Sequence, residues 1–250
     1  MNRTAFRKLF KSIGPAVLPV IHVLDNEQAE RNVRTITGEG AQGVFLINHD
    51  FSREELIPVI EHVRATFPAL WMGVNFLAVT GKEAFPILGE LEARGVPVDA
   101  YWADDARIDE RVETQAEAEE IDRIRADSGW SGMYFGGTAF KKQREVAPED
   151  YGRSAELACR HMDVVTTSGI ATGEAADLTK INTFREACGD HAIGIASGVT
   201  PENVGNYAGD VDAILVATGI NLEGDFYNAD PARLRQLMAN VRTIGLGQGR

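Results

Sequence analysis

The sequence predicts a single (β/α)8 barrel over residues 1–250, and three observations favour this fold. The chain has 250 residues, 44% of them hydrophobic, which is a usual size for an eightfold barrel with a substantial core. Eight short apolar segments alternate with helical patterns, as in a parallel sheet covered by helices. A doubly wound open sheet is the alternative. Its glycine fingerprint is missing after the first apolar segment, where the chain reads Val23-Leu24-Asp25-Asn26, so we favour the barrel.

The predicted strands are short and rich in β-branched residues, with room between them each time for a loop and a helix. The fourth is short and follows Val96-Pro97. In chain order the predicted strands are residues 17–23, 43–47, 71–77, 100–102, 133–135, 164–167, 193–196 and 214–216.

Capping residues mark the starts of two predicted helices. Ser52 and Glu55 have the spacing of a capping box, in which each residue bonds the other's backbone. Pro58 lies inside the same helical pattern, so we expect this helix to be kinked or to start late. The last helix is predicted to have Asp230 as its N-cap and Pro231 as its first residue, because proline suits that position.

Both ends of the chain are predicted to be accessory to the barrel. Residues 1–14 contain a short helix that places Phe6, Leu9 and Phe10 on one face. That face could close the bottom of the barrel or contact a partner. Residues 245–250 contain three glycines and are predicted to be a flexible tail.

Charge and cysteine content exclude several classes of protein. The formal net charge of -12 argues against nucleic-acid binding and gives no reason to expect an anionic membrane partner. The apolar run 16–24 is too short and too interrupted for a membrane span or signal. Cys159 and Cys188 lack a C-x-x-C partner, which fits a reduced cytoplasmic setting rather than a disulfide scaffold. The charged run 104–120 is predicted to lie largely on a solvated helix.

Candidate functional residues follow from the barrel geometry, because catalytic groups lie at the C-terminal ends of the strands. Polar residues occur at nearly every predicted end. They are His22 and Asp25; Asn48, His49 and Asp50; Asn75; Asp104 and Asp105; Thr138 and Lys141; and Thr166, Ser168 and Thr172.

Four of these residues are the candidate catalytic groups. His49 lies between an amide and a carboxylate, a setting that suits acid–base catalysis, a divalent ion or only a helix cap. Of Asp104 and Asp105 only one can face the barrel axis, because neighbouring strand residues alternate. Lys141, or its neighbours Lys142 and Arg144, could neutralise a phosphate or carboxylate.

The remaining candidates are predicted to orient or bind the substrate. Asn75, the fourth candidate catalytic group, and Thr166 would orient hydroxyl groups. His22 lies within an apolar strand and is either a core histidine or a binding group. Asn48, Ser168 and Thr172 are predicted to contact the substrate.

Two strand ends near the C-terminus predict a phosphate site. Ser197-Gly198 follows the seventh strand and Thr218-Gly219 follows the eighth, and loops seven and eight hold the phosphate in many barrels. Thr200 and Pro201 predict a helix start that would aim backbone N–H groups at the anion. The alternative is two tight turns without a ligand, since glycine is common in such turns.

The same part of the chain resembles the BtpA family of barrel proteins. The resemblance rests on residues 167–178, 197–204 and 217–224, and on Asn75 within Gly73-Val74-Asn75-Phe76-Leu77. It implies a barrel similar to phosphoribosylanthranilate isomerase and a presumed enzymatic activity. The member that gave the family its name is linked to photosystem I biogenesis.

The chain departs from this family pattern in two places. The first strand has His22-Val23-Leu24-Asp25 where the family has a His-Leu-Pro-Pro-Leu-Pro stretch. Residues 78–144 also match poorly. The sequence therefore looks like a divergent member, and the substrate of another member does not transfer to it.

The predicted function is enzymatic action on a small phosphorylated metabolite, such as a sugar phosphate or ribosyl phosphate. Isomerisation, carbon–carbon cleavage and glycosyl or phosphoribosyl transfer all stay open. The alternative is a non-catalytic assembly factor that uses the barrel as a platform, although a platform does not need polar strand ends. We predict no cofactor, although a divalent cation could be held, and we expect that the chain could form a homo-oligomer.

Overall fold

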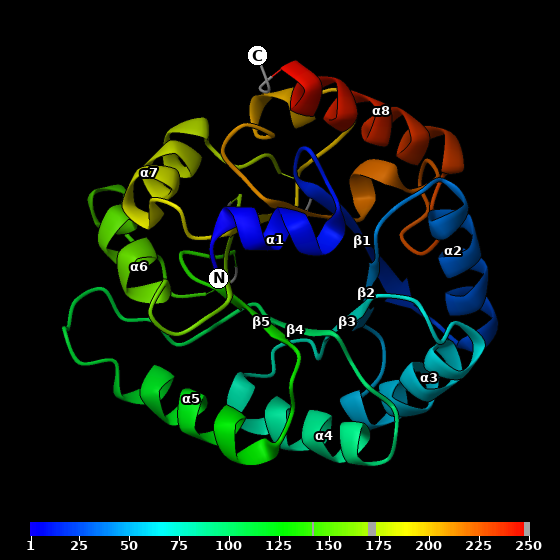
Figure 1. Ribbon diagram of the computed structural model, residues 1–250, viewed down its shortest axis with the longest axis horizontal. Helices are drawn as coiled ribbons and strands as arrows, with labels where there is room; N and C mark the ends of the chain where they lie inside the picture. Colours follow the sequence, from blue (N-terminus) through cyan, green and yellow to red (C-terminus); the bar gives the residue numbers. More distant parts are fainter. Residues whose placement is uncertain (142, 170–173, 248–250) are drawn as a thin grey trace.

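Eight parallel strands close into a barrel in sequence order across the described part of the chain, with helices around it (Figure 1). The structure is a computed structural model that describes residues 1–141, 143–169 and 174–247. The predicted (β/α)8 fold is confirmed. The strands are β1 (Ala16–Val23), β2 (Val44–Asn48), β3 (Met72–Asn75), β4 (Ala100–Ala103), β5 (Met133–Gly137), β6 (Val164–Ser168), β7 (Ile193–Ala196) and β8 (Ala213–Val216).

The helices alternate with the strands on the outside of the barrel. The α-helices are α1 (Arg3–Phe10), α2 (Asn26–Gly38), α3 (Arg53–Thr66), α4 (Gly81–Ala93), α5 (Ala116–Ser128), α6 (Tyr151–Ala158), α7 (Leu178–Cys188) and α8 (Pro231–Gly247). Short 3-10 helices are η1 (Pro148–Asp150), η2 (Val204–Asn206) and η3 (Thr218–Ile220). Because every strand runs in the same direction, all the C-terminal strand ends meet at one rim.

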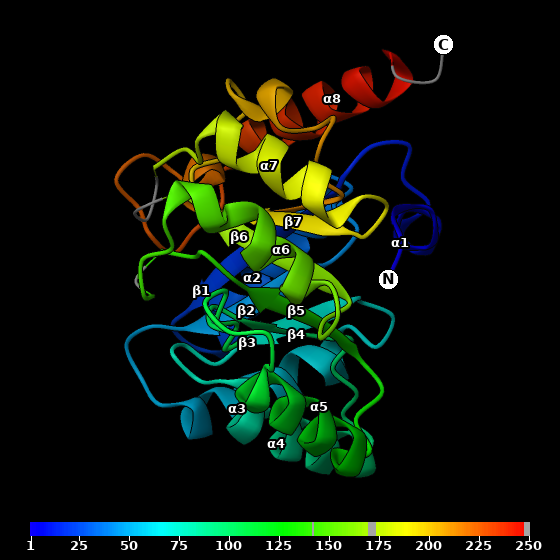
Figure 2. The same cartoon turned by 90° about the vertical axis from the view of Figure 1, so that its left-hand side faces the viewer.

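The N-terminal helix covers the other end of the barrel (Figure 2). Phe6 is fully buried and its ring lies 6.1 Å from the ring of Phe135 in the barrel interior. Phe10 packs edge-on against Trp71 at 5.0 Å. Of the two predicted roles of this helix, the structure therefore shows the first: it closes the bottom of the barrel. Leu9 is 50% exposed, so its placement on the buried face was wrong.

Helix starts follow the capping residues. Ser52 and Glu55 form both bonds of a capping box, and α3 begins directly afterwards at Arg53. Of the two alternatives for this helix the late start was wrong, because the helix begins at Arg53 and contains Pro58; a kink stays a prediction. Asp230 accepts a hydrogen bond of 2.8 Å from the backbone N–H of Ala232 at the start of α8. This helix continues to Gly247, into the segment predicted to be a tail, and residues 248–250 lie outside the described part.

A buried carboxylate joins the closing helix to the barrel. Asp212, immediately before β8, is fully buried. Its carboxylate contacts the guanidinium groups of Arg3 at 2.9 Å, Arg7 at 3.3 Å and Arg185 at 3.2 Å. It also accepts a bond of 3.1 Å from the N–H of Ile193. One side chain thus connects α1, α7, β7 and β8 at the N-terminal end of the barrel.

The two cysteines are neighbours in space despite their separation in sequence. Cys188 is buried, and its Sγ lies 3.8 Å from the carbonyl oxygen of Ala155. The same oxygen accepts the backbone N–H of Cys159 at 3.1 Å. The side-chain hydrogen bond with Cys159, together with burial, raises the pKa of the Cys188 thiol. Both cysteines are free thiols.

The charged run after β4 is mostly a loop, which corrects the prediction of a helix. Only residues from Ala116 onward are helical, in α5. Glu110 in this loop is 4% exposed, and its carboxylate accepts a bond of 2.8 Å from Arg144. This ion pair holds the loop against the neighbouring loop that carries Arg144. A loop fixed by such a contact has no amphipathic periodicity in its sequence. Within the described residues, no helix has the length and apolar character needed to cross a membrane.

Candidate active site

A narrow cavity of about 60 Å³ opens at the C-terminal rim of the barrel. Its floor is apolar and is formed by Val20, Ile47, Leu77, Trp102, Leu215 and Ala217. Its polar wall contains His22, His49, Asp104, Lys141, Ser197 and Thr218. The structure thus brings together six predicted site residues that come from six different strand ends.

His22 is the most closely defined group in this wall. Its Nδ1 lies 2.9 Å from the carbonyl oxygen of Phe226, and a carbonyl can only accept, so the proton is on Nδ1. Burial, with His49 and Lys141 nearby, lowers the pKa of His22 to about 4. The ring is therefore neutral at pH 7, and Nε2 is a hydrogen-bond acceptor. The neighbouring His49 ring is perpendicular to it at 4.8 Å.

Asp104 lines the narrow cavity, whereas Asp105 does not. The Oδ1 of Asp104 accepts a bond of 3.1 Å from the Nδ2 of Asn75, whereas Asp105 accepts the backbone N–H of Arg107 at 2.8 Å. This agrees with the expected alternation. Asn75 is 1% exposed, and its Oδ1 has no hydrogen-bond partner among the described residues.

Buried polar atoms on β4 and β6 lie in a similar situation. Thr166 is fully buried, and neither its Oγ1 nor the Nε1 of Trp102 has a hydrogen-bond partner among the residues described. Register places Thr166 opposite Gly137 on one side and Gly194 on the other. Such unmatched buried groups are uncommon and call for an explanation in each case.

Two predicted binding residues have local structural contacts instead of lining this cavity. Asn48 donates from Nδ2 to the carbonyl of Phe51 at 2.7 Å and accepts the N–H of Leu77 at 3.1 Å, so it fixes two loops. Ser168 donates from Oγ to the carbonyl of Gly169 at 2.7 Å. It accepts the backbone N–H of Lys141 at 2.8 Å. Thr172 and Lys142 lie outside the described residues.

Sequence reasoning missed Lys180, a buried cation behind this rim. Its ammonium group donates to the carbonyl of Ser168 at 2.9 Å and to that of Ala139. Burial lowers the pKa of Lys180 to about 8. By joining the ends of the loops after β5 and β6, it holds the segment that carries Lys141. Nothing in the sequence distinguishes it from a surface lysine on a helix.

The loop after β7 is a tight turn, so the predicted helix start at Pro201 was wrong. Ser197 and Gly198 both have positive φ, 75° and 71°. The side chain of Asn203 accepts the N–H of Thr200 at 2.8 Å and donates to the carbonyl of Gly198 at 2.8 Å. These two bonds fix the turn, and the residues after it form turns and η2 instead of an α-helix.

Gly198 and Gly219 are required by close contact between loops. A Cβ on Gly198 would lie 1.9 Å from the carbonyl oxygen of Glu174, and one on Gly219 would lie 1.9 Å from that of Val199. Neither position can hold a side chain without backbone movement. The loops after β6, β7 and β8 therefore touch through their backbones.

A second, open cavity of about 950 Å³ lies beside the narrow one and shares Thr218 with it. Gly198, Val199 and Thr200 line one side, and Thr218 and Gly219 begin another. Arg233 supplies a cation at its edge, where it donates to the carbonyl of Gly219 at 2.9 Å and pairs with Glu202 at 3.1 Å. The open cavity is thus formed by the loops after β7 and β8.

The loop between β8 and α8 folds over the ends of β1 and β2, a feature that sequence reasoning missed. The ring of Phe226 stacks on His22 at 3.8 Å. Tyr227 donates from its hydroxyl to Asp50 at 2.7 Å, and its carbonyl accepts from Gln28 on α2 at 2.7 Å. These contacts join residues about 200 positions apart, so no local pattern could reveal them.

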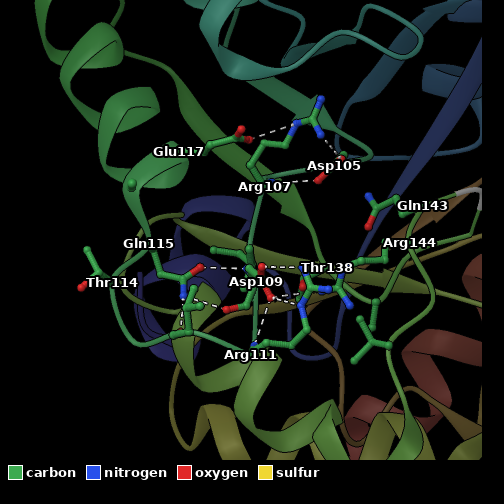
Figure 3. A pocket seen from close by; sticks show the side chains of 15 residues that line it. Asp105, Arg107, Asp109, Arg111, Thr114, Gln115, Glu117, Thr138, Gln143 and Arg144 are labelled. Carbon is green, nitrogen blue, oxygen red and sulfur yellow. Dashed lines mark hydrogen bonds and ion pairs between the residues drawn. The ribbon is translucent and has the colours of Figure 1, made fainter.

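A third cavity, of about 420 Å³, lies between the loops after β4 and β5 (Figure 3). Its arginines are engaged with carboxylates. Arg107 pairs with Asp105 at 3.4 Å, and Arg111 pairs with Asp109 at 2.7 Å. Arg144, a sequence candidate for phosphate binding, pairs with the buried Glu110. The first two pairs lie within the loop after β4, and the pair of Arg144 with Glu110 joins the two loops.

The described residues contain no group of three or more His, Cys, Asp or Glu side chains suited to a metal ion. The rim instead combines a neutral imidazole, a carboxylate, an ammonium group and hydroxyls in one cavity. These are the groups used in acid–base chemistry on small polar molecules.

The fold and the rim define the class of this protein: a closed (β/α)8 barrel with titratable side chains beside the loops after β7 and β8. The chain belongs to the BtpA family, whose model matches residues 59–243. The match includes residues 78–144, where the resemblance was weak. It begins at residue 59 and so does not include β1, where the chain departs from the family pattern.

Solved structures with the same fold are distant in sequence. The tryptophan synthase alpha chain of Legionella pneumophila subsp. pneumophila is 16% identical, with a TM-score of 0.65 and coverage of 98% of this chain and 99% of that one. Phosphoribosyl anthranilate isomerase of Thermus thermophilus is 17% identical, with a TM-score of 0.58 and coverage of 94% and 99%. These similarities concern the fold. No curated protein sequence matches this chain.

Proposed function

We propose that the protein is an enzyme that acts on a small phosphorylated metabolite, such as a sugar phosphate or ribosyl phosphate. The observation that carries this proposal is the convergence of His22, His49, Asp104 and Lys141 on one cavity that shares Thr218 with the open cavity of loops seven and eight. In barrel enzymes a phosphate commonly binds at those loops, together with a short extra helix. Here η3 begins at Thr218.

The two cavities suggest how the substrate would lie. The phosphate would bind in the open cavity, against Gly198, Thr218 and Gly219, with Ser197 at the boundary. The reacting end would enter the narrow cavity, which has room for only a few non-hydrogen atoms. Lys141 would neutralise negative charge on the substrate there.

Proton transfer in the narrow cavity would use one group that accepts a proton and neighbouring groups that can donate one. The neutral His22 offers Nε2 as a base, which deepens its predicted role as a binding residue. Asp104, held by Asn75, and His49 are the neighbouring acid–base candidates. The unmatched Oδ1 of Asn75 and Oγ1 of Thr166 support their predicted role in orienting hydroxyl groups, with small movements of the cavity floor when substrate binds.

Isomerisation, carbon–carbon cleavage and glycosyl or phosphoribosyl transfer are all compatible with this set of groups. In each of these reactions a proton moves or a charge develops at a carbon or oxygen atom near a bound phosphate. The names of the two solved relatives, a synthase and an isomerase, support enzymatic activity in this fold. A homo-oligomer, a cytoplasmic location, a bound divalent cation and the absence of nucleic-acid and membrane partners stay predictions.

Phosphate binding is the first test of this function. Inorganic phosphate and ribose 5-phosphate are expected to raise the Tm of the protein, because a ligand at about 100 times its Kd adds roughly 2.7 kcal/mol to the free energy of unfolding. Thr218→Val removes a hydroxyl shared by both cavities and should reduce the shift. Thr243→Val, at an exposed position on α8, is the matched control and should keep it.

The outcome of this experiment separates the enzyme from its alternative. A wild-type protein whose Tm responds to neither compound would contradict the proposal and favour an assembly factor. Gly198 is a poor site for the same test. Any side chain there would collide with the backbone at Glu174, so lost binding could reflect a displaced loop.

A further inference from the structure

We propose that the β8–α8 loop, residues 217–230, is a positioning device for His22, held in place from α2. The backbone carbonyl of Phe226 holds the His22 ring with its proton on Nδ1. Asn32 and Gln28 on α2 fix the loop that presents this carbonyl. The assignment of His22 as a base rests on the proposed function, whereas the positioning is a property of the free protein.

Phe226 contacts the His22 ring both at its protonated edge and on one face. The carbonyl of Phe226 accepts from His22 at 2.9 Å and from the side chain of Asn221 at 2.8 Å. The Phe226 ring stacks on the imidazole with an interplanar angle of 10°. One residue therefore fixes both the protonated edge and one face of His22.

Two buried amide side chains attach the loop to α2. The Nδ2 of Asn32 donates to the carbonyl of Tyr227 at 3.1 Å, and its Oδ1 accepts the N–H of Ala229 at 2.9 Å. The Nε2 of Gln28 donates both to Tyr227 at 2.7 Å and to the carbonyl of His22 at 3.1 Å. Asn32 and Gln28 are 4% and 2% exposed. Buried amides that use donor and acceptor together define a loop position closely.

The chemistry of the His22 ring depends on which of its two nitrogens carries the proton. His49, Lys141, Asp50 and Asp104 are the charged or titratable groups near it. With Nδ1 bound to an oxygen, Nε2 is the nitrogen that can accept a proton from a substrate. If the loop moved away, water would reach the ring and either nitrogen could carry the proton. Positioning by the loop therefore selects the tautomer.

The same loop also lines the open cavity, through residues from Asn221 to Phe226. A substrate whose phosphate binds there would contact the segment that orients the base. The loop thus joins the two ends of the proposed substrate site, and substrate binding is expected to restrain it further.

Nitrogen-15 NMR of the histidine rings tests this inference on the whole protein without any substrate. His22→Asn assigns the His22 signals. In the wild type they should report a proton on Nδ1 and a midpoint well below that of an ordinary histidine. Asn32→Leu removes two loop contacts and should raise the His22 midpoint by about one unit and mix the two tautomers, because solvation favours the charged ring.

Asn240→Leu is the matched control. Asn240 lies on α8, and its Nδ2 donates to the carbonyl of Pro201 at 2.8 Å, so its loss disturbs a different loop in the same way. The His22 signals should not change. If Asn32→Leu folds normally by circular dichroism and leaves the His22 tautomer and midpoint unchanged, the positioning role is overturned. Should Asn32→Leu fail to fold, Gln28→Leu gives the same decision. The phosphate-induced Tm shift of the wild type reports separately on the proposed function.

Discussion

Replacing Asp212 with alanine is expected to lower the free energy of unfolding by about 3 kcal/mol, because it leaves three partly buried guanidinium groups without their counter-charge and the N–H of Ile193 without its acceptor. The carboxylate is fully buried and contacts three arginines and a strand N–H. Its removal would release α1 from the barrel bottom as well. Urea denaturation followed by circular dichroism measures the change.

The control for this variant is Asp127→Ala. Asp127 is an exposed carboxylate on α5, and surface substitutions of this kind usually change stability by about 0.5 kcal/mol or less. A loss below about 1 kcal/mol in Asp212→Ala would show that water or a shift of α1 replaces the ion pairs at little cost.

Lowering the pH from about 6.5 to 4 is expected to reduce stability by roughly 3 kcal/mol through His22 alone. The pKa of His22 in the folded protein is about 4, against 6.5 as its ordinary value, and each unit corresponds to about 1.4 kcal/mol. Between these values the unfolded chain binds the proton and the folded protein does not, so stability falls as pH falls. The effect fades as the pH rises through 6.5, because the unfolded chain then also loses the proton.

His22→Asn should remove this pH dependence, because an amide can still donate to the Phe226 carbonyl but does not titrate. Urea midpoints measured from pH 4.5 to 7.5 for both proteins isolate the His22 contribution. His62→Asn on α3, where the ring is 34% exposed beside Glu30, controls for loss of a surface histidine. Parallel curves for wild type and His22→Asn would contradict the low pKa.

The repeating strands of this fold could be predicted from the sequence. Each predicted strand is present, since an apolar run between helical patterns is a local signal. Strand position then placed His22, His49 and Asp104 at one rim, and alternation correctly separated Asp104 from Asp105. These successes share one cause: barrel geometry converts position along the chain into position in space.

The rest depends on contacts that no local pattern encodes. Phe226 contacts His22 through its own backbone carbonyl, and Lys180 donates to the backbone carbonyl of Ser168. Such contacts between separate segments leave no periodicity in the sequence. The Thr200–Pro201 start signal failed because the segment after it, residues 203–209, contains two asparagines and two glycines, which are weak helix formers. Glu110 was read as part of a solvated face because its partner Arg144 lies on another loop.

The absence of any side chain at Gly198 and Gly219 has a consequence for changing this protein. Since the backbones of three consecutive loops touch there, an insertion or substitution in one of them must be accommodated by the other two. The loops after β4 and β5 share one backbone contact at their starts, where the N–H of Ala106 donates to the carbonyl of Gly137 at 2.9 Å. Farther along they meet through long side chains, as where Arg144 pairs with Asp109 (Figure 3). Side chains can be exchanged one at a time, so new substrate specificity is best sought in these outer parts, with the loops after β6, β7 and β8 kept as they are.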